Sequence, residues 1–287
     1  MTRIAIVTDS AACIPADLVR QYSIHVLPLV LVFGERVYLD GVDMTTAQFY
    51  QMLREAKSPP TTSHPSLGDF LELYTSLARQ ADGIVSIHVP AGLSGILHTA
   101  EAAARMYCSV PIRLLDSGTA VTAEGFVVLA AAKAAAAGAN LEQVVQAAQA
   151  VIPRVKLYAT LGTLDYLARS GRVPGIAALL GSVLDLHPVF GLQQGRVHLA
   201  IRLRTKRHAI QYMLDQMAEE VGKTPVHAAV FHADAADEAE RLRQQVAQQF
   251  DCIDLYVTEF TPVMGAHTGP GVIGLAFYAA PPTEDNA

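Results

Sequence analysis

The chain has 287 residues, a formal net charge of −6, 51% hydrophobic residues and a mean hydropathy of +0.28. The acidic balance and the lack of a basic helix argue against nucleic-acid binding. Three widely spaced cysteines (Cys13, Cys108 and Cys252) predict neither a disulfide framework nor a zinc site, and they fit a reducing compartment.

The most apolar long stretch, residues 125–139, is mostly alanine and contains Lys133. Alanine favours a helix but contributes little transfer energy, so we expect a buried helix rather than a membrane span. Because residues 1–3 lead directly into an apolar strand, we expect no signal peptide. These features predict a soluble cytoplasmic protein.

The first half of the chain alternates strand-like and helix-like segments. Strands are predicted at residues 3–10, 24–33, 83–89 and 112–118, and helices at residues 46–56, 67–81, 93–107 and within 125–139. This alternation predicts a mainly parallel sheet with helices on both faces. The segments beginning TDS, HVPAGLSG and LLDSGT would then lie at the carboxyl edge of the sheet, where such folds place ligand loops. We assign residues 1–152 to an N-terminal α/β domain.

The second half has a different pattern. It predicts a strand at residues 155–162, short helices at 163–171 and 174–184, two strands around a turn within 186–204, a helix at 205–221, a strand at 226–232, a helix at 236–250 and two final strands. We expect a second α/β domain, residues 153–280, with a mixed or antiparallel sheet. Residues 281–287 are predicted to form a disordered tail.

Common catalytic and cofactor motifs are incomplete or absent. Gly269, Gly271 and Gly274 form a G-x-G-x-x-G, but a strand and then the end of the chain follow them, whereas a dinucleotide site requires a helix. The stretch AGLSG lacks the last glycine of a nucleophile elbow, because Ile96 stands at that position. No metal-binding spacing and no Walker loop occur.

Hydroxyl-rich loops are the remaining candidates for chemistry. Ser66 followed by Asp69 predicts a capping box ahead of a helix. Ser94 opens another helix, where it can either cap the helix or, with nearby backbone N–H groups, face an anion, and both alternatives stay open. For Asp116 and Ser117 we favour helix capping.

Eight segments in order resemble the motifs of a known family. They are IVTDSAACIP, PLVLVFGERVYLDGVDMTTAQFYQML, PTTSHPS (family pattern P-T-T-S-Q-P-S), GLSGILHTAEAA, LLDSGTAVTAEG, LDYLARSGRVP, LHPVFGLQQGRV and GAHTGPGVIGLAFY. Each is weak alone, but the ordered set covers nearly the whole chain and resembles the DegV family of bacterial fatty-acid-binding proteins.

The resemblance implies two α/β domains with one fatty acid, such as palmitate, stearate or oleate, in a deep apolar cleft between them. It also implies a lipid-binding subunit without catalysis of its own. Better-understood members present the fatty acid to an ATP-dependent kinase subunit, and the acyl phosphate then enters phospholipid synthesis. Matching positions imply that Thr62, Ser94, the Gly95 N–H and His267 bind the carboxylate.

Physical chemistry is consistent with that assignment. A buried carboxylate needs hydrogen-bond donors, which two hydroxyls, a backbone N–H and an imidazole supply. We expect Gly265, Gly269 and Gly271 to adopt positive φ and to let the backbone approach the head group closely.

The chain departs from the family pattern at several positions: Pro90, Ala91, Ile96, Ser170 and His187 replace the usual residues. Arg172, Arg202, Arg204, Lys206 and Arg207 predict either a basic patch for a kinase or an anionic membrane, or ordinary solvated charges. Two other functions stay open: an esterase-like or phosphoesterase-like enzyme using the same cleft, and a regulatory module in which the lipid is a structural plug.

Overall fold

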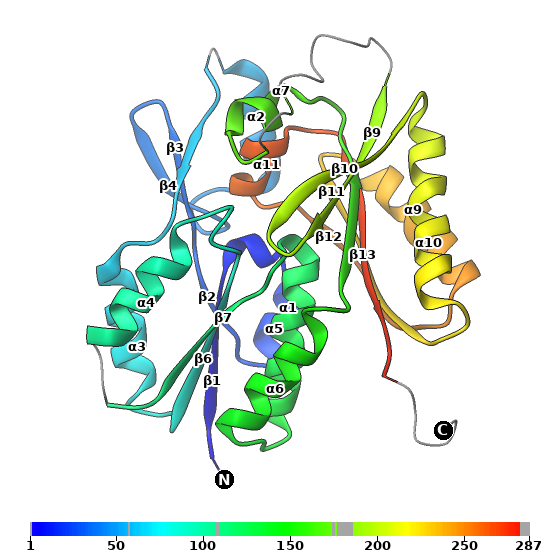
Figure 1. Ribbon diagram of the computed structural model, residues 1–287. Coiled ribbons are helices and arrows are strands. Elements are labelled where there is room, and N and C mark those ends of the chain that lie inside the picture. The colour runs from blue at the N-terminus through cyan, green and yellow to red at the C-terminus, as the bar shows by residue number, and fades with distance from the viewer. Residues whose placement is uncertain (1, 57, 107–108, 174–175, 177–185, 282–287) are drawn as a thin grey trace. The chain divides into compact units, whose positions relative to one another are not determined.

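The computed structural model describes residues 2–56, 58–106, 109–173, 176 and 186–281 (Figure 1). These residues group into two compact units. Unit 1 contains residues 1–153 with the short segments 194–196 and 261–266, and unit 2 contains residues 154–193, 197–260 and 267–287. The predicted helix at 174–184, apart from Ile176, and the predicted tail beyond residue 281 lie outside the described residues.

The main sheet of unit 1 is entirely parallel, with strand order β2-β1-β6-β7. Its strands are β1 (Ile4–Asp9), β2 (His25–Leu27), β6 (Gly83–His88) and β7 (Ile112–Asp116). All residues of β1 and β6 are buried, as is typical of central strands covered on both faces. The mainly parallel sheet predicted for the first half is therefore confirmed.

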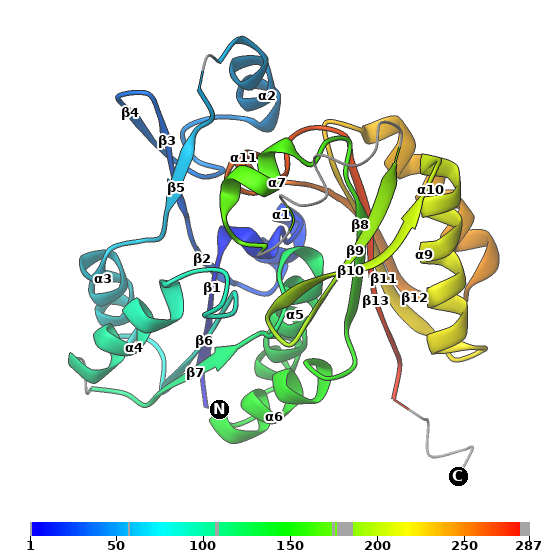
Figure 2. The same cartoon turned by 45° about the horizontal axis from the view of Figure 1, so that its top comes forward.

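Helices cover both faces of this sheet (Figures 1 and 2). One face carries α3 (Leu67–Leu77) and α4 (Ile96–Met106), and the other carries α5 (Val121–Ala136) and α6 (Leu141–Val151). The capping box predicted for Ser66 and Asp69 is present at the start of α3. The alanine-rich segment forms α5, and eleven of the first twelve residues of this helix are buried. No described helix is both long and apolar enough to cross a membrane.

A second, antiparallel sheet in unit 1 was not predicted. It has the order β4-β3-β5, from β3 (Val30–Phe33), β4 (Arg36–Leu39) and β5 (Thr61–Ser63). The single strand expected at residues 24–33 is wrong: Pro28 separates β2 from β3, and the two strands join different sheets. Unit 1 also contains α1 (Ala16–Gln21), α2 (Thr46–Glu55) and a 3₁₀ turn, Ser10–Ala12.

Unit 2 is built on one mixed sheet of order β10-β9-β8-β13-β11-β12. β11 and β12 pair in parallel, whereas β11 with β13, β13 with β8 and β8 with β9 pair antiparallel, so the prediction of a mixed sheet is confirmed. The strands are β8 (Lys156–Thr160), β9 (His187–Gln193), β10 (Arg196–Leu203), β11 (Val226–Ala233), β12 (Cys252–Glu259) and β13 (Val272–Ala279).

Two long helices, α9 (Lys206–Val221) and α10 (Ala236–Gln249), cover one face of the unit 2 sheet (Figures 1 and 2). Met213 and Met217 of α9 and Val246 of α10 are fully buried against Val230 and Leu275 of the sheet. Two short helices complete the described elements, α7 (Asp165–Ser170) and α11 (Pro262–Thr268). The sequence predicts no helix where α11 forms.

Candidate functional site

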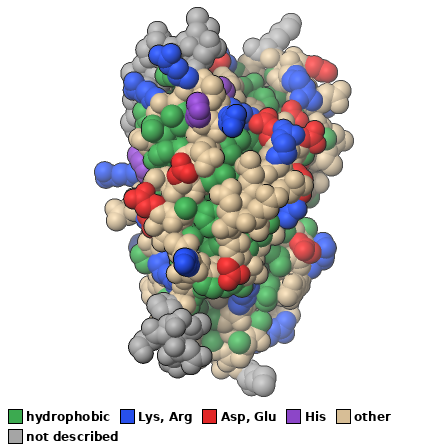
Figure 3. All heavy atoms as spheres, turned by 90° about the vertical axis from the view of Figure 1, so that its right-hand side faces the viewer, with side chains coloured by type: hydrophobic (Ala, Val, Ile, Leu, Met, Phe, Trp, Pro, Cys, Tyr) green, Lys and Arg blue, Asp and Glu red, His purple; other side chains and the backbone are tan. Residues whose placement is uncertain are grey.

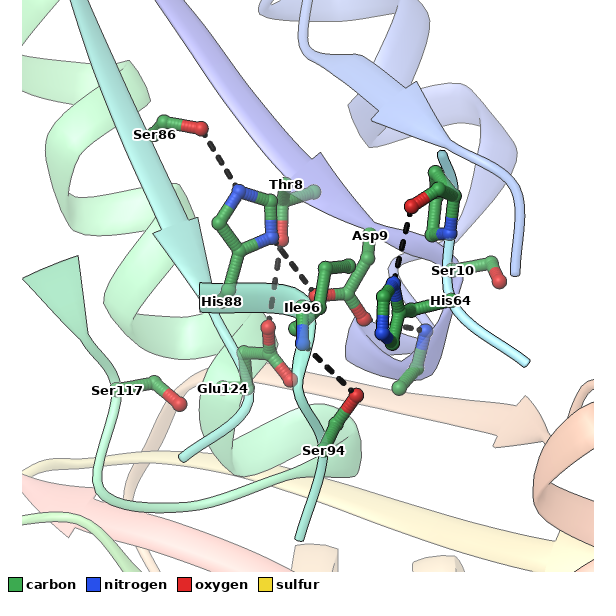
Figure 4. A network of polar contacts seen from close by, with 12 residues as sticks. Thr8, Asp9, Ser10, His64, Ser86, His88, Ser94, Ile96, Ser117 and Glu124 are labelled. Atoms are coloured by element: carbon green, nitrogen blue, oxygen red, sulfur yellow. Dashed lines mark hydrogen bonds and ion pairs between the residues drawn. The ribbon is translucent and has the colours of Figure 1, made fainter. Parts of the chain in front are cut away.

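Ser94 and Gly95 lie in the tight turn between β6 and α4. The carbonyl of Pro90 accepts hydrogen bonds from the N–H groups of Leu93 and Ser94, at 2.8 and 3.2 Å. Ser94 Oγ accepts from the N–H of Ile96 over 3.2 Å (Figure 4). The capping alternative for Ser94 is therefore confirmed, but it does not exhaust the side chain, because a hydroxyl that accepts one bond still has a proton to donate.

Thr62 lies in the middle of β5, where its residue pairs with Leu31 of β3. The sequence analysis did not predict this short strand. Successive side chains of a strand alternate between faces, and Thr62 is half-buried while Thr61 and Ser63 are exposed. The strand therefore fixes the face of the sheet from which the Thr62 side chain projects.

His64 is a residue of this region that we did not predict. Its Nδ1 lies 3.0 Å from the carbonyl oxygen of Pro65 and 3.5 Å from Thr99 Oγ1 on α4. A Cβ added to Gly95 would lie 3.0 Å from His64 Nε2, so the imidazole packs against that glycine. His64 thus connects the loop after β5 to the turn that holds Ser94. The only signal in the sequence was a histidine where the family pattern has glutamine.

A fully buried chain of hydrogen bonds connects the ends of β1 and β6. Tyr74 Oη donates to Ser86 Oγ over 2.9 Å. Ser86 Oγ lies 2.8 Å from His88 Nε2, and His88 Nδ1 lies 2.9 Å from Asp9 Oδ2 (Figure 4). This order of serine, histidine and aspartate is that of a hydrolase triad. All three are 0% exposed, so a substrate has no access to the serine, and the set stabilises the fold.

Glu124 of α5 lies beside this chain of hydrogen bonds (Figure 4). Its Oε1 accepts from Thr8 Oγ1 over 3.5 Å, and the side chain is fully buried. Burial raises the pKa of Glu124 well above its usual range, and the charge of Asp9 raises it further. The carboxyl end of β1 is therefore a region where additional negative charge is unfavourable.

Asp116 and Ser117 make hydrogen bonds within the loop that follows β7 and do not cap a helix. The capping role predicted for them is therefore wrong. Asp116 Oδ1 accepts from the N–H of Gly118 over 2.7 Å, and Ser117 Oγ donates to the carbonyl of Thr119 over 2.8 Å. The N-cap of α5 is Ala120, which has no side-chain capping bond. Short polar side chains after a strand favour such local turns.

His267 lies in α11, near its end, and is half-buried. Burial lowers the pKa of His267 to about 4, and the positive charge of Arg172 contributes to the decrease. The imidazole is therefore uncharged at neutral pH and carries one N–H. Arg172, which we had grouped with surface charges, instead lies within electrostatic range of His267.

The glycines around His267 have different reasons to be glycine. Gly269 and Gly271 adopt positive φ, at 71° and 85°, as predicted. Gly265 does not: it lies inside α11, where an added Cβ would come within 2.7 Å of Phe49 and Tyr50. The positive φ predicted for Gly265 is therefore wrong. Close packing of the helix, and not the backbone conformation, requires a glycine at this position.

The basic residues do not form one set of equivalent charges. Lys206 Nζ pairs with Glu238 at 2.7 Å and donates to the carbonyl of Gly271 over 3.2 Å. Arg202, Arg204 and Arg207 are exposed. On the face formed by α9 and α10, acidic and basic side chains are interspersed (Figure 3). Among the described residues, no group of His, Cys, Asp and Glu could hold a metal ion.

Comparison with known proteins agrees with these motifs. Residues 3–280 match the model of the DegV family, which is described as an uncharacterised protein family. The DegV domain-containing protein SCO2569 of Streptomyces coelicolor is 39% identical over 95% of this chain and 97% of its own length.

Two solved structures are similar over nearly the whole chain. A fatty-acid-binding DegV family protein from Thermus thermophilus has 32% identity and a TM-score of 0.91, covering 97% of this chain and 100% of the other. DegV of Bacillus subtilis, also a fatty acid binding protein, has 30% identity and a TM-score of 0.90, covering 98% and 100%. The protein described here belongs to the DegV family.

Proposed function

We propose that this protein binds a long-chain fatty acid in the cytoplasm and presents it to an ATP-dependent fatty acid kinase subunit. The observation that carries the proposal is the similarity over nearly the full length to two fatty-acid-binding structures at 32% and 30% identity. Palmitate, stearate and oleate are the expected ligands. The sequence-predicted domains, residues 1–152 and 153–280, are part of this proposal.

In this proposal the carboxylate is bound by the hydroxyls of Thr62 and Ser94, the N–H of Gly95 and the N–H of His267. Two structural features support these roles. Ser94 retains a proton to donate after it accepts from Ile96. A low pKa keeps the imidazole of His267 neutral, so it donates without bringing a second buried charge.

The hydrocarbon tail dominates the affinity and the head group fixes the orientation. Each charge-assisted hydrogen bond contributes roughly 1.5–3 kcal/mol. Each buried methylene contributes about 0.8 kcal/mol, so about fourteen of them contribute on the order of 11 kcal/mol before ordering is subtracted. Loss of one donor should therefore weaken binding without abolishing it.

Mass spectrometry of an organic extract of the purified protein tests the ligand class. We expect one fatty acid per chain. Ser94→Ala and His267→Ala should retain less of it in a lipid-transfer assay. Matched controls are Ser76→Ala and His98→Ala, whose side chains are exposed on α3 and α4. An empty extract with no uptake of added fatty acid would contradict the proposal.

The kinase step needs a separate test, in which acyl phosphate made by a fatty acid kinase subunit and ATP is trapped as the hydroxamate. We expect Arg202→Glu and Arg204→Glu to lose turnover while retaining the ligand, with Arg241→Glu on α10 as the control. Loss of binding to anionic vesicles instead would assign the basic residues to a membrane surface.

Two further outcomes distinguish the alternatives. Hydrolysis of an ester or phosphoester by the wild-type protein that disappears in Ser94→Ala would favour the esterase-like or phosphoesterase-like enzyme. A bound lipid that never exchanges with added fatty acid would assign a structural plug in a regulatory module.

A further inference from the structure

The first turn of α11 is held by a carboxylate from a distant part of unit 1. Asp40 Oδ1 accepts a hydrogen bond from the N–H of Val263 over 3.0 Å. Asp40 follows β4 in the chain and is only 3% exposed. The first N–H groups of a helix have no partner within the helix. Asp40 therefore supplies from elsewhere the acceptor that the short helix lacks.

The other oxygen of Asp40 is also engaged. Ser10 Oγ donates to Asp40 Oδ2 over 2.6 Å, and the same hydroxyl accepts from the N–H of Leu29 over 3.0 Å. Burial raises the pKa of Asp40 above its ordinary value, although the hydrogen bonds from Ser10 and Val263 oppose the increase. A buried carboxylate with two short, directed hydrogen bonds is held in one orientation.

The turn that contains Asp40 does not need this carboxylate. Its backbone is closed by the N–H groups of Val42 and Asp43, which donate to the carbonyl of Leu39 over 3.1 and 3.0 Å. Asp43 closes the turn from the other side, because its Oδ2 accepts from the Leu39 N–H over 2.6 Å. Both Asp40 oxygens point away from the turn, toward Ser10 and Val263. A purely local role would leave a buried charge unexplained.

What the carboxylate fixes is the start of the helix that carries His267. Val263 and His267 are four residues apart, so they lie on one face of α11, one turn from each other. A helix of seven residues is marginal by itself and depends on tertiary contacts. Gly265 supplies a second such contact, since it packs directly against Phe49 and Tyr50 of α2.

We propose that Asp40 is a positioning residue for the fatty-acid head group: through Val263 it fixes α11 and thereby the imidazole of His267. The proposal rests on the function proposed above, and it adds a residue that does not touch the ligand. Ser10 is the support that orients Asp40.

The test uses Asp40→Ala, Asp40→Asn and Ser10→Ala in the full chain. Asp43→Ala is the matched control, because it removes a carboxylate hydrogen bond from the same turn without touching α11. The first readout is the titration of His267 followed by NMR of its imidazole, assigned by comparison with His267→Asn. The second readout is the affinity for palmitate.

In Asp40→Ala we expect the His267 midpoint to rise from about 4 toward its ordinary value, by on the order of one pH unit, because the end of α11 becomes less buried. Palmitate affinity should fall about tenfold. Asp40→Asn keeps an acceptor for the Val263 N–H, so its His267 midpoint and palmitate affinity should be closer to those of wild type. Ser10→Ala should give values between those of wild type and Asp40→Ala. Asp43→Ala should leave the midpoint unchanged.

An unchanged His267 midpoint in Asp40→Ala, or an equal change in Asp43→Ala, would overturn the positioning role. If Asp40→Ala does not fold, Asp40→Asn and Ser10→Ala decide by the same criteria. The titration of His267 needs no ligand, so the positioning role of Asp40 can be contradicted independently of the proposed fatty-acid binding. Wild-type protein that takes up no fatty acid contradicts the proposed function, whereas equal palmitate affinity in wild type and Asp40→Ala contradicts the positioning role.

Discussion

A neutral imidazole suits the buried end of a carboxylate site. His267 has a pKa of about 4 because of burial and the positive charge of Arg172. In the proposed site it would donate one hydrogen bond to the carboxylate, and the positive charge of Arg172 would act on that carboxylate at longer range. The flanking glycines drew attention to His267 in the sequence. Its charge state could not be predicted, because it depends on burial and on a residue far away in the chain.

The depressed pKa of His267 predicts a pH dependence of stability. The unfolded chain takes up this proton near the ordinary value of 6.5 and the folded chain only near 4. Between these values the unfolded state binds more protons, so lowering the pH through this window destabilises the fold, by at most about 3 kcal/mol for this residue.

We expect His267→Asn to lose less stability than wild type between pH 6.5 and 4.5 in urea denaturation. His25 and His232 also have lowered pKa values, so the difference between variant and wild type, not the slope itself, isolates His267. The exposed His98→Asn serves as the control and should match wild type. Parallel curves for His267→Asn and wild type would show that the histidine titrates normally.

The buried pair of His88 and Asp9 should act through stability. His88→Ala leaves the Asp9 carboxylate buried without its imidazole partner, which typically costs 3–5 kcal/mol. We expect a loss of this size in urea denaturation. Adding Asp9→Asn to His88→Ala should cost less than the sum of the two single changes, because the unpaired charge is then removed. A loss in the double variant equal to the sum of the two single losses would contradict a structural role. So would an esterase activity that disappears in Ser86→Ala.

At the scale of elements, β5 and α11 are two of those that the sequence did not predict, and both are short and depend on distant contacts. The strand β5 has three residues and forms only because β3 lies beside it. The helix α11 contains Gly265, which disfavours helices, and depends on Asp40 and α2 for support. In contrast, the long α10 ends within one residue of its prediction, because its apolar periodicity is a local property.

Two glycine-to-alanine changes in helices should have opposite effects. Gly265→Ala places a methyl group within 2.7 Å of Phe49 and Tyr50, whose side chains are almost fully buried and have little room to move. We expect a loss of about 1–3 kcal/mol from overpacking and weaker fatty-acid retention. Gly68 is exposed in the first turn of α3, and a Cβ added there would contact only Ser66 Oγ, at 3.5 Å.

Gly68→Ala should therefore stabilise the protein by up to about 1 kcal/mol, since alanine favours helices over glycine. Urea denaturation of both variants measures the contrast. If both changes stabilise the protein, α11 tolerates a side chain at residue 265 and the packing argument for that glycine is wrong.

At the scale of the whole molecule, the alternation of strands and helices was sufficient to predict a parallel sheet followed by a mixed one. It did not give the small sheet of β3, β4 and β5: the hairpin of β3 and β4 was missed, and β5 has only three residues and pairs with β3 across the intervening α2, which leaves no local pattern. The same limit applies to the candidate site. Ser94 and Ser66 stand beside recognisable helix starts, whereas the roles of His64, Arg172 and Asp40 depend on contacts with distant segments.

The final prediction concerns ligand and stability together. A ligand that binds only the folded state stabilises it, by about 2.7 kcal/mol when its free concentration is one hundred times Kd. For a protein of 287 residues, whose entropy of unfolding is about 0.6 kcal/mol/K, that corresponds to a rise in Tm of roughly 4–5 °C. We expect delipidated protein to show such a rise with palmitate, stearate or oleate, measured by differential scanning fluorimetry.

The methyl ester of the same fatty acid separates the tail from the head group. If the tail dominates affinity while Thr62, Ser94 and His267 bind the carboxylate, the ester should give a smaller but measurable rise. His267→Ala should reduce the rise with the acid and leave the rise with the ester nearly unchanged. Equal rises with acid and ester would contradict the carboxylate site, and no rise with either would contradict fatty-acid binding itself.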